Sequence, residues 1–184
     1  MEIIHNETID NILDRRSVRF YTEEKLTDSE IATLLECAKW APSSRNGQPC
    51  SVFGVTSSEF LRDMNIAFKD FVGWDTPAYT NWDKSPFYQN APAMFFIFST
   101  GNNMTDAGIM VENLAIAAQG LGLNSVIIGS VGGFLNNEAS EELRKQMGVP
   151  DNLKFQISIA VGHGTENPVK KPRINENFKI AVSD

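Results

Sequence analysis

The sequence predicts one folded domain that contains both α-helices and β-strands. The 184 residues are 42% hydrophobic, which is enough for one sizeable core and leaves little room for two domains. Segments with apolar residues at helical spacing alternate with short apolar runs typical of strands. The clearest run, 94–98, is continuously apolar and indicates a strand buried on both faces. We therefore expect a single domain over residues 1–184.

The first half of the chain carries clear helix-start signals. Thr8 is placed to cap a short helix. Thr27-Asp28-Ser29-Glu30 has the form of a capping box, in which side-chain oxygens at both ends bind free backbone amides. Ser57 or Ser58 is placed to cap a third helix. The predicted order is a helix ending near residue 15, a helix from 28 to before 42, a turn-rich segment at 41–49, a strand at 51–56 and a helix to about 68.

The second half begins with an aromatic segment, 70–90, that includes Trp74 and Trp82. Such a loop covers a ligand or a partner, or else forms its own small hydrophobic cluster, and composition leaves both open. A helix at 105–121 is rich in small residues, which favours a central or interface position. The remaining predictions are a strand at 124–128, a glycine-rich loop at 129–137, a helix at 138–147, a strand at 155–161 and a C-terminal extension at 162–184.

Positive charge is concentrated at two points of a chain whose formal net charge is -7. Arg15, Arg16 and Arg19 fall within five residues that also contain Ser17. A second basic run, Lys170-Lys171-Pro172-Arg173, lies near the other end. Guanidinium groups pair with phosphate oxygens and a hydroxyl adds a donor, so folding that joins the two runs would suit a phosphate-bearing ligand. Taken alone, the arginine run is equally typical of a solvated basic turn.

Composition excludes several other classes of function. The acidic balance argues against nucleic-acid binding and against electrostatic attachment to membranes. No stretch approaches the length of a membrane span and residues 1–14 lack the apolar core of a signal peptide, so we expect a cytoplasmic protein. Two cysteines and two isolated histidines give no disulfide framework and no expected metal site.

Two further motifs have ordinary alternatives. Ser43, Ser44, Asn46 and Gln48 offer hydroxyl and amide groups suited to a heterocycle with donors and acceptors along its edge, although a helix-to-strand turn has the same composition. The glycine pairs at 120–122 and 162–164 do not complete a Gly-x-Gly-x-x-Gly motif, and we interpret them as chain turns.

The order of the motifs, more than any one of them, resembles the FMN-dependent nitroreductase family over almost the whole chain. The matching segments are Arg15-Arg16-Ser17-Val18-Arg19-Phe20, Ala41-Pro42-Ser43-Ser44-Arg45-Asn46-Gly47-Gln48-Pro49, Gly120-Leu121-Gly122-Leu123 with Ile128-Gly129, and Lys171-Pro172-Arg173. The first two segments together are fairly specific, and the last two are supportive.

The resemblance implies a cofactor-binding role for each matching position. Arg15 would meet the FMN phosphate, Arg19 would approach the pyrimidine side of the flavin, and Asn46 would lie near its reactive edge. Arg19 and Asn46 are also the residues expected to tune the flavin, and no separate catalytic residue is implied. The full set of expected cofactor-binding residues is Arg15, Arg16, Ser17, Arg19, Pro42, Ser43, Ser44, Asn46, Gln48, Gly129, Lys171 and Arg173.

The resemblance also implies a fold. It is an α+β, three-layer, nitroreductase-like fold with a mostly antiparallel central sheet flanked by helices, and two chains intertwine into a homodimer. Two features depart from the family pattern. Cys50 follows Gln48-Pro49 where relatives often have an aromatic residue, and the chain is shorter than many relatives.

The implied function is electron transfer from NADH or NADPH through FMN to a small flat acceptor, such as a nitroaromatic or a quinone, by a ping-pong mechanism. Trp74 and Trp82, in a lid at about 70–90, are the candidate substrate contacts. Alternatives with the same fold are reductive dehalogenation or flavin metabolism, and an alternative of another class is a non-catalytic flavin-binding or redox-sensing protein. Deiodinase-like relatives use a lid that contains an acidic residue and a lysine. The segment 70–90 has Lys84 but no glutamate, which argues against this alternative.

Overall fold

A four-stranded antiparallel sheet forms the centre of the molecule. The computed structural model describes residues 2–76 and 86–174. The strands are β1 (Cys50–Val55), β2 (Ala93–Ser99), β3 (Asn124–Ile128) and β4 (Lys154–Gly162), in the order β1-β2-β4-β3. Each neighbouring pair is antiparallel. The predicted α+β class with an antiparallel sheet is therefore confirmed.

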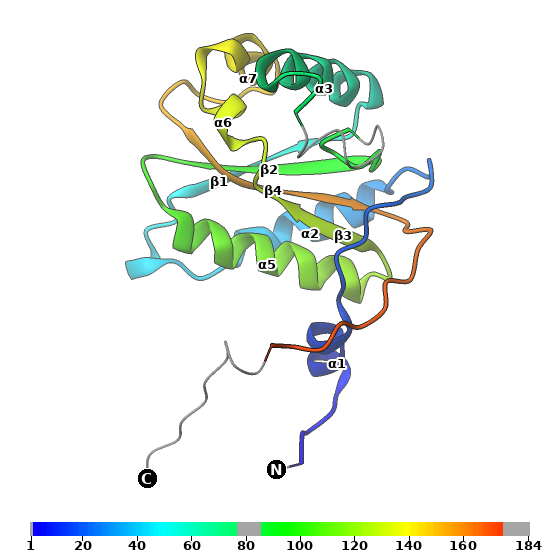
Figure 1. Cartoon of the computed structure of the whole chain (residues 1–184). Coiled ribbons are helices and arrows are strands. Elements are labelled where there is room, and N and C mark those ends of the chain that lie inside the picture. Colours follow the sequence, from blue (N-terminus) through cyan, green and yellow to red (C-terminus); the bar gives the residue numbers. More distant parts are fainter. Residues whose placement is uncertain (1, 77–85, 175–184) are drawn as a thin grey trace.

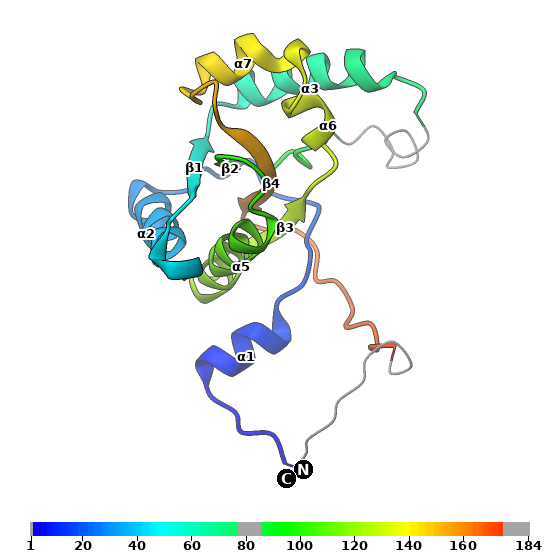
Figure 2. The same ribbon diagram turned by 90° about the vertical axis from the view of Figure 1, so that its left-hand side faces the viewer.

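Helices cover both faces of this sheet (Figures 1 and 2). The first face carries α3 (Ser58–Val72), α6 (Gly132–Leu135), the 3₁₀ turn η2 (Glu138–Ser140) and α7 (Glu141–Gln146). The opposite face carries α2 (Asp28–Lys39) and α5 (Met104–Gly120). Helix α1 (Glu7–Asp14) lies farther from the sheet, beyond α5. The sheet and its two helix layers make the three-layer arrangement that the family resemblance implies.

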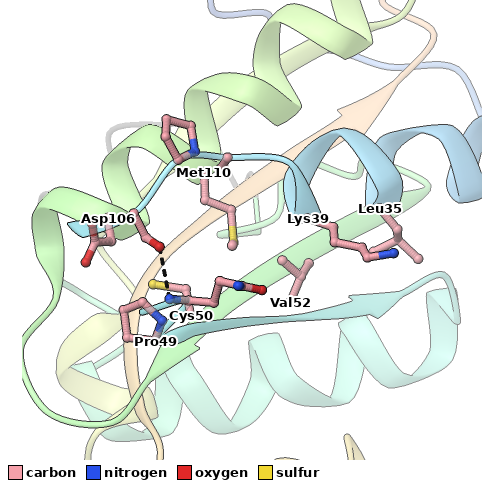
Figure 3. A pocket seen from close by; sticks show the side chains of 11 residues that line it. Leu35, Lys39, Pro49, Cys50, Val52, Asp106 and Met110 are labelled. Atoms are coloured by element: carbon pink, nitrogen blue, oxygen red, sulfur yellow. Dashed lines mark hydrogen bonds between the residues drawn. The ribbon is translucent and has the colours of Figure 1, made fainter. Parts of the chain in front are cut away.

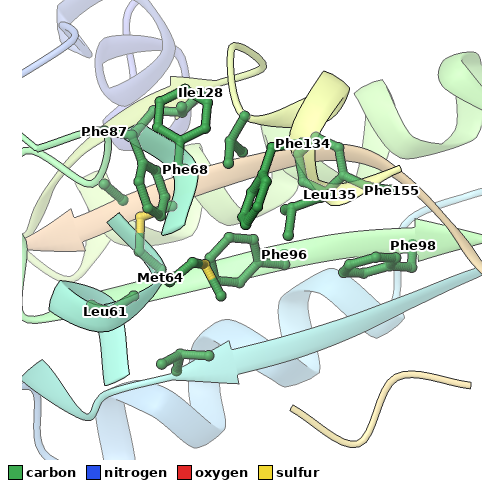
Figure 4. Close-up of a cluster of buried hydrophobic side chains, with 14 of the residues drawn as sticks. Leu61, Met64, Phe68, Phe87, Phe96, Phe98, Ile128, Phe134, Leu135 and Phe155 are labelled. Carbon is green, nitrogen blue, oxygen red and sulfur yellow. The ribbon is translucent and has the colours of Figure 1, made fainter. Parts of the chain in front are cut away.

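Strand β2 shows why both faces are covered. Its seven residues are all buried, and alternate side chains point to opposite faces. Phe96 and Phe98 join the cluster beneath α3 and α6, whereas Phe95 and Ile97 join the cluster beneath α2 and α5. Figure 4 shows Phe96 and Phe98 among the aromatic rings of the first cluster. The continuous apolar run therefore forms the centre of two hydrophobic cores.

The helix caps confirm one prediction and correct another. Thr27 and Glu30 form the reciprocal capping box at the start of α2, as predicted. Ser57 caps α3 by accepting the amide hydrogen bond of Phe60. The first helix begins earlier than predicted, because Asn6 rather than Thr8 is its cap and its side chain accepts from the Ile9 amide. Asparagine and threonine are both favourable N-cap residues, so residue type alone does not decide which of the two caps the helix.

The glycine-rich segment 129–137 differs from the loop predicted there. It contains the short helix α6, whose Phe134 and Leu135 are buried against the first face of the sheet. The helix predicted at 138–147 is divided into η2 and α7. The local glycine content favours a loop, but burial of the two apolar side chains decides the conformation.

Helix α5 is the central helix predicted from its small residues. Ala107, Ala115 and Ala118 are fully buried, which lets the helix approach the sheet closely. The amide of Asn113 donates to the carbonyl of Cys37 and joins α5 to α2. In the described ranges, no helix has the length and apolar character needed to cross a membrane.

Candidate functional site

Residues 15–22 form an extended segment, here called the strap, along the edge of the sheet. The backbone amide of Val18 donates to the carbonyl of Ser125 in β3, at 3.0 Å, and Ser17 forms a parallel bridge with Ser125. Val18 is 1% exposed, so its side chain anchors the strap in the protein interior. The first basic run is thus fixed to an edge strand and is not a free turn.

The strap also pairs with the segment that follows β4. The amide of Thr22 donates to the carbonyl of His163 at 2.8 Å, and the amide of Thr165 donates to the carbonyl of Phe20 at 2.9 Å. Tyr21 and Gly164 form the antiparallel bridge between these two bonds. This short ladder brings the N-terminal strap beside the start of the C-terminal segment, which is called the tail (166–174).

The strap and the tail enclose a cavity of about 680 Å³, here called the basic cavity. Arg16, Ser17 and Arg19 line it from the strap side. The complete lining is Ile12, Leu13, Arg16, Ser17, Arg19, Pro168, Val169, Lys170, Lys171, Pro172 and Arg173. The two basic runs, about 150 residues apart in the printed sequence, therefore contribute to one site, as a phosphate-bearing ligand would require.

Local hydrogen bonds organise the strap side of this cavity. The guanidinium of Arg16 donates to the carbonyls of Leu13 and Arg15, at 2.8 and 2.7 Å. The guanidinium of Arg19 lies 3.4 Å from the carbonyl of Ser17. On the tail side, Nζ of Lys170 lies 4.0 Å from the carboxylate of Asp14, an exposed pair. The cavity thus gathers guanidinium, ammonium and hydroxyl donors around one space.

Arg15 lies next to the basic cavity without lining it. Its Nε atom is buried and has no hydrogen-bond partner in the described part of the chain. The nearest carboxylate, from Glu112 of α5, is 3.8 Å away, too far for a hydrogen bond. The Nε atom is covered, so an anion would have to pair with the exposed part of the guanidinium, whose charge suits a phosphate.

The polar loop of the sequence lines a second space, the loop cavity, of about 300 Å³ (Figure 3). Pro42, Ser43 and Gln48 contribute to its wall. The other lining residues are Leu35, Lys39, Ala41, Pro49, Cys50, Val52, Asp106 and Met110. Oγ of Ser43 accepts the amide hydrogen bond of Gln48 at 2.9 Å. The loop cavity is therefore formed by the α2-to-β1 connection against the first turns of α5.

Three of the five described non-glycine residues with positive φ lie in this loop. Arg45, Asn46 and Gln48 have φ values of 54°, 55° and 46°, the left-handed region that glycine adopts more easily. The middle of the loop is the 3₁₀ turn η1 (Ser44–Asn46). Each such residue costs on the order of 1 kcal/mol, and strain of this kind gathers at ligand-binding segments. This observation favours a binding role for the loop over an ordinary turn.

Cys50 lines the loop cavity beside Asp106. Burial, with a smaller effect from the Asp106 carboxylate, raises the pKa of the Cys50 thiol to about 11. The thiol is therefore protonated at neutral pH and is a poor nucleophile. The residue that departs from the family pattern contributes to the shape of this cavity rather than to covalent chemistry.

Gly129 and Trp74 are two further expected site residues that the structure describes. Gly129 follows β3, and a Cβ atom on it would be 3.2 Å from Cδ1 of Ile157, so a side chain there would require the end of the Ile157 side chain to shift slightly. Trp74 lines neither cavity. Its indole donates to Asp70 at 2.8 Å, and Nζ of Lys69 lies 5.4 Å from its ring centroid. Trp82 and Lys84 lie outside the described residues.

Some site residues were missed by sequence reasoning. Lys170 belongs to the basic run and could have been included on that signal. Asp106 and Met110 carry no sequence signal, because only the packing of α5 brings them to the loop cavity. Glu166 accepts a hydrogen bond from the Arg19 amide at 2.6 Å, a contact between residues far apart in sequence.

Comparison with known proteins identifies the family and the fold. The model of the nitroreductase family matches residues 12–163. The NADPH-flavin oxidoreductase of Vibrio harveyi is 29% identical over 174 residues, covering 92% of this chain and 70% of that protein. A nitroreductase from Desulfitobacterium hafniense, solved with bound FMN, shares the fold with a TM-score of 0.87 at 24% identity over 97% of this chain and all of that one. The chain belongs to the nitroreductase family.

Proposed function

We propose that this chain is an FMN-dependent oxidoreductase. It would pass reducing equivalents from NADH or NADPH to a small flat acceptor, such as a nitroaromatic or a quinone, by a ping-pong mechanism. The observation that carries the proposal is the joining of both basic runs around one cavity. Membership of the nitroreductase family and the names of the relatives support the same conclusion.

The basic cavity fits the phosphate end of FMN. Arg16 and Ser17 supply donors from the strap, and Lys171 and Arg173 supply cations from the tail. Arg15 would add the exposed part of its guanidinium. Charge-assisted hydrogen bonds of this kind are the strong ones, and guanidinium groups match phosphate geometry. These residues would bind the cofactor at its anionic end.

The protein would position the cofactor and polarise its ring, while the bound FMN would supply the chemistry of hydride and electron transfer. Arg19 places a positive charge where it would stabilise negative charge on the pyrimidine side of the ring. The strained polar loop would border the flavin ring through Pro42, Ser43, Ser44, Asn46 and Gln48. Gly129, which has no side chain, would leave space for the ring on another side. No acidic or basic side chain has to transfer a proton in this proposal.

We further propose that the functional unit is a homodimer. The strap residues and the loop residues line two separate cavities of one chain, so a second copy would complete the site. Helix α1 has no buried residue, and it exposes Ile12 and Leu13, with 49% and 36% of their surface accessible. Burial of this apolar face against a partner would be favourable. Light scattering after size exclusion should therefore give twice the chain mass of 20.4 kDa.

The function is tested by identifying the cofactor and then measuring turnover. Purified protein should be yellow, and denaturation should release FMN. Steady-state rates at several NADH or NADPH and nitroaromatic concentrations should give parallel double-reciprocal lines, as a ping-pong mechanism requires. Bound FMN without turnover would instead favour a flavin-binding or redox-sensing role. Turnover only with a halogenated aromatic would favour dehalogenation. We expect the reaction in the cytoplasm, where both reduced nicotinamides are available.

A further inference from the structure

The carboxylate of Glu166 is the first group of the tail to contact the strap. Its Oε1 atom accepts the backbone amide hydrogen bond of Arg19 at 2.6 Å. Glu166 is half-buried, as is Arg19. The side chain therefore binds the backbone of a residue whose own side chain lines the basic cavity.

The register of the short ladder explains why a side chain is needed here. Phe20 faces Thr165 and Thr22 faces His163, so the next opposed pair is Arg19 with Glu166. At this point the tail leaves the ladder toward Pro168, which lines the cavity and has no amide hydrogen to donate. Hydrogen-bonded pairs alternate along an antiparallel ladder, so the Arg19 amide points away from the tail backbone at this pair, and the Glu166 carboxylate supplies its acceptor instead.

Two other contacts hold the strap in place. The Val18 amide donates to Ser125, and the Tyr21 hydroxyl donates to the Val18 carbonyl at 2.6 Å. Burial raises the pKa of Tyr21 well above its usual range, and the nearby Glu166 charge acts in the same direction. Glu166 is thus the contact that ties this fixed strap to the tail.

We propose that Glu166 is a positioning residue for the cofactor site: by fixing the Arg19 backbone it holds the strap and the tail across the basic cavity. The inference rests on the proposed function, because it assigns the residue to FMN binding. Glu166 acts through Arg19 and through the direction of the tail, and it is not itself a ligand of the phosphate.

The negative charge of Glu166 and its hydrogen bond to Arg19 should have opposite effects on FMN affinity. A carboxylate beside a basic cavity repels an anionic cofactor, so loss of the charge alone should not weaken FMN binding. Loss of the hydrogen bond should weaken it, because Arg19 is no longer held. Glu166→Gln keeps an oxygen that accepts the Arg19 amide and removes the charge. Glu166→Ala removes both.

The first measurement is the FMN dissociation constant of the reconstituted protein by flavin fluorescence. Glu166→Ala should bind FMN on the order of tenfold more weakly, because a lost hydrogen bond to a charged group costs about one factor of ten or more. Glu166→Gln should bind as tightly as wild type or slightly more tightly. Glu142→Ala, an exposed glutamate on α7, is the matched control and should bind as wild type.

A double-mutant cycle separates positioning from a general loss of structure. Arg19→Ala removes the side chain but keeps the backbone amide, so Glu166→Ala should have a smaller effect on FMN affinity in an Arg19→Ala background than in wild type, and the effect that remains reports the direction of the tail. An effect equally large in both backgrounds would contradict the inference. Equal weakening by Glu166→Gln and Glu166→Ala would contradict it as well.

Hydrogen exchange provides a measurement that does not depend on FMN. The Arg19 amide should be protected in wild type and in Glu166→Gln, and should exchange at least tenfold faster in Glu166→Ala, while the Val18 amide keeps its protection. Unchanged exchange at Arg19 would overturn this inference whatever FMN does. Wild-type protein that binds no FMN would instead contradict the proposed function.

Discussion

Gly164 lies so close to Val18 that a Cβ atom on the glycine would be 2.8 Å from Cγ1 of Val18. The same Cβ would be 2.5 Å from Oδ1 of Asn124, which accepts the Gly164 amide hydrogen bond. The strap can therefore cross the end of β4 only because this residue has no side chain. The close approach also explains the second glycine of the Gly-His-Gly motif, beyond its role in a chain turn.

Gly164→Ala should push the strap away from β4, because the added methyl group would clash with the Val18 side chain on one side and with Asn124 on the other. FMN binding should weaken by at least tenfold. The protein should remain folded with a lower melting temperature. Gly133→Ala is the control, since nothing lies within 4 Å of its Cβ position. Flavin fluorescence and thermal unfolding measure the two effects. Unchanged FMN affinity in Gly164→Ala would contradict the role of this contact.

Arg15→Ala should give folded protein that purifies largely without yellow colour. The proposed function assigns its guanidinium to the FMN phosphate, so its loss would remove a charge-assisted interaction with the cofactor. Arg144→Ala is a matched control, because Arg144 also has a buried Nε without a partner but belongs to α7 on the other face of the sheet. The ratio of flavin to protein absorbance checks the prediction. Full flavin content in Arg15→Ala would remove the phosphate-contact assignment.

Trp74→Ala should change the kinetics of the electron acceptor while FMN remains bound. Lys69 and Asp70 hold the indole outside both cavities, so we assign it to acceptor selection rather than to cofactor binding. Trp74→Phe keeps a flat ring and should retain most of the wild-type acceptor preference. The value of kcat/KM for a nitroaromatic and for a quinone measures the effect. Identical ratios in wild type and Trp74→Ala would disprove the lid interpretation.

The capping box of α2 should make a pH-dependent contribution to stability. Hydrogen bonds from the backbone and then the side chain of Thr27 lower the pKa of Glu30 below its ordinary value of 4.5. A depressed carboxyl pKa stabilises the folded state above the unfolded pKa, and this contribution is lost as the pH falls through the lowered value. The difference in unfolding free energy between wild type and Glu30→Gln should therefore be constant from pH 7 to about 5 and decrease in more acid solution.

Thr27→Ala provides a second check on the same cap. It should lower the free energy of unfolding by about 1 kcal/mol, the usual contribution of a helix N-cap. The FMN content should not change, because Thr27 lines neither cavity. Urea unfolding at neutral pH measures the difference.

The features predicted from the sequence are those with local causes. The capping box at Thr27 depends on neighbouring side chains, and the buried strand at 94–98 depends on a continuous apolar run. Local signals were less decisive at Asn6 and Thr8, two acceptable caps only two residues apart. They failed at α6, where burial of Phe134 and Leu135 outweighs the glycines around them.

The candidate site was predictable in its parts but not in its assembly. Both basic runs stand out as charge clusters in an acidic chain. Their common cavity depends on Val18 meeting Ser125, Phe20 meeting Thr165 and Glu166 meeting Arg19, and no short-range pattern encodes these pairings. The same holds for Asp106 beside Cys50, which packing of α5 brings to the loop cavity.

Anaerobic reduction of the bound flavin tests the central claim most directly. NADH or NADPH added to the purified yellow protein without oxygen should bleach the visible flavin band, and a nitroaromatic or quinone added afterwards should restore it. The first half shows that the bound cofactor accepts electrons from a nicotinamide, and the second shows that it passes them on. A flavin band that neither nicotinamide bleaches would contradict the proposed oxidoreductase.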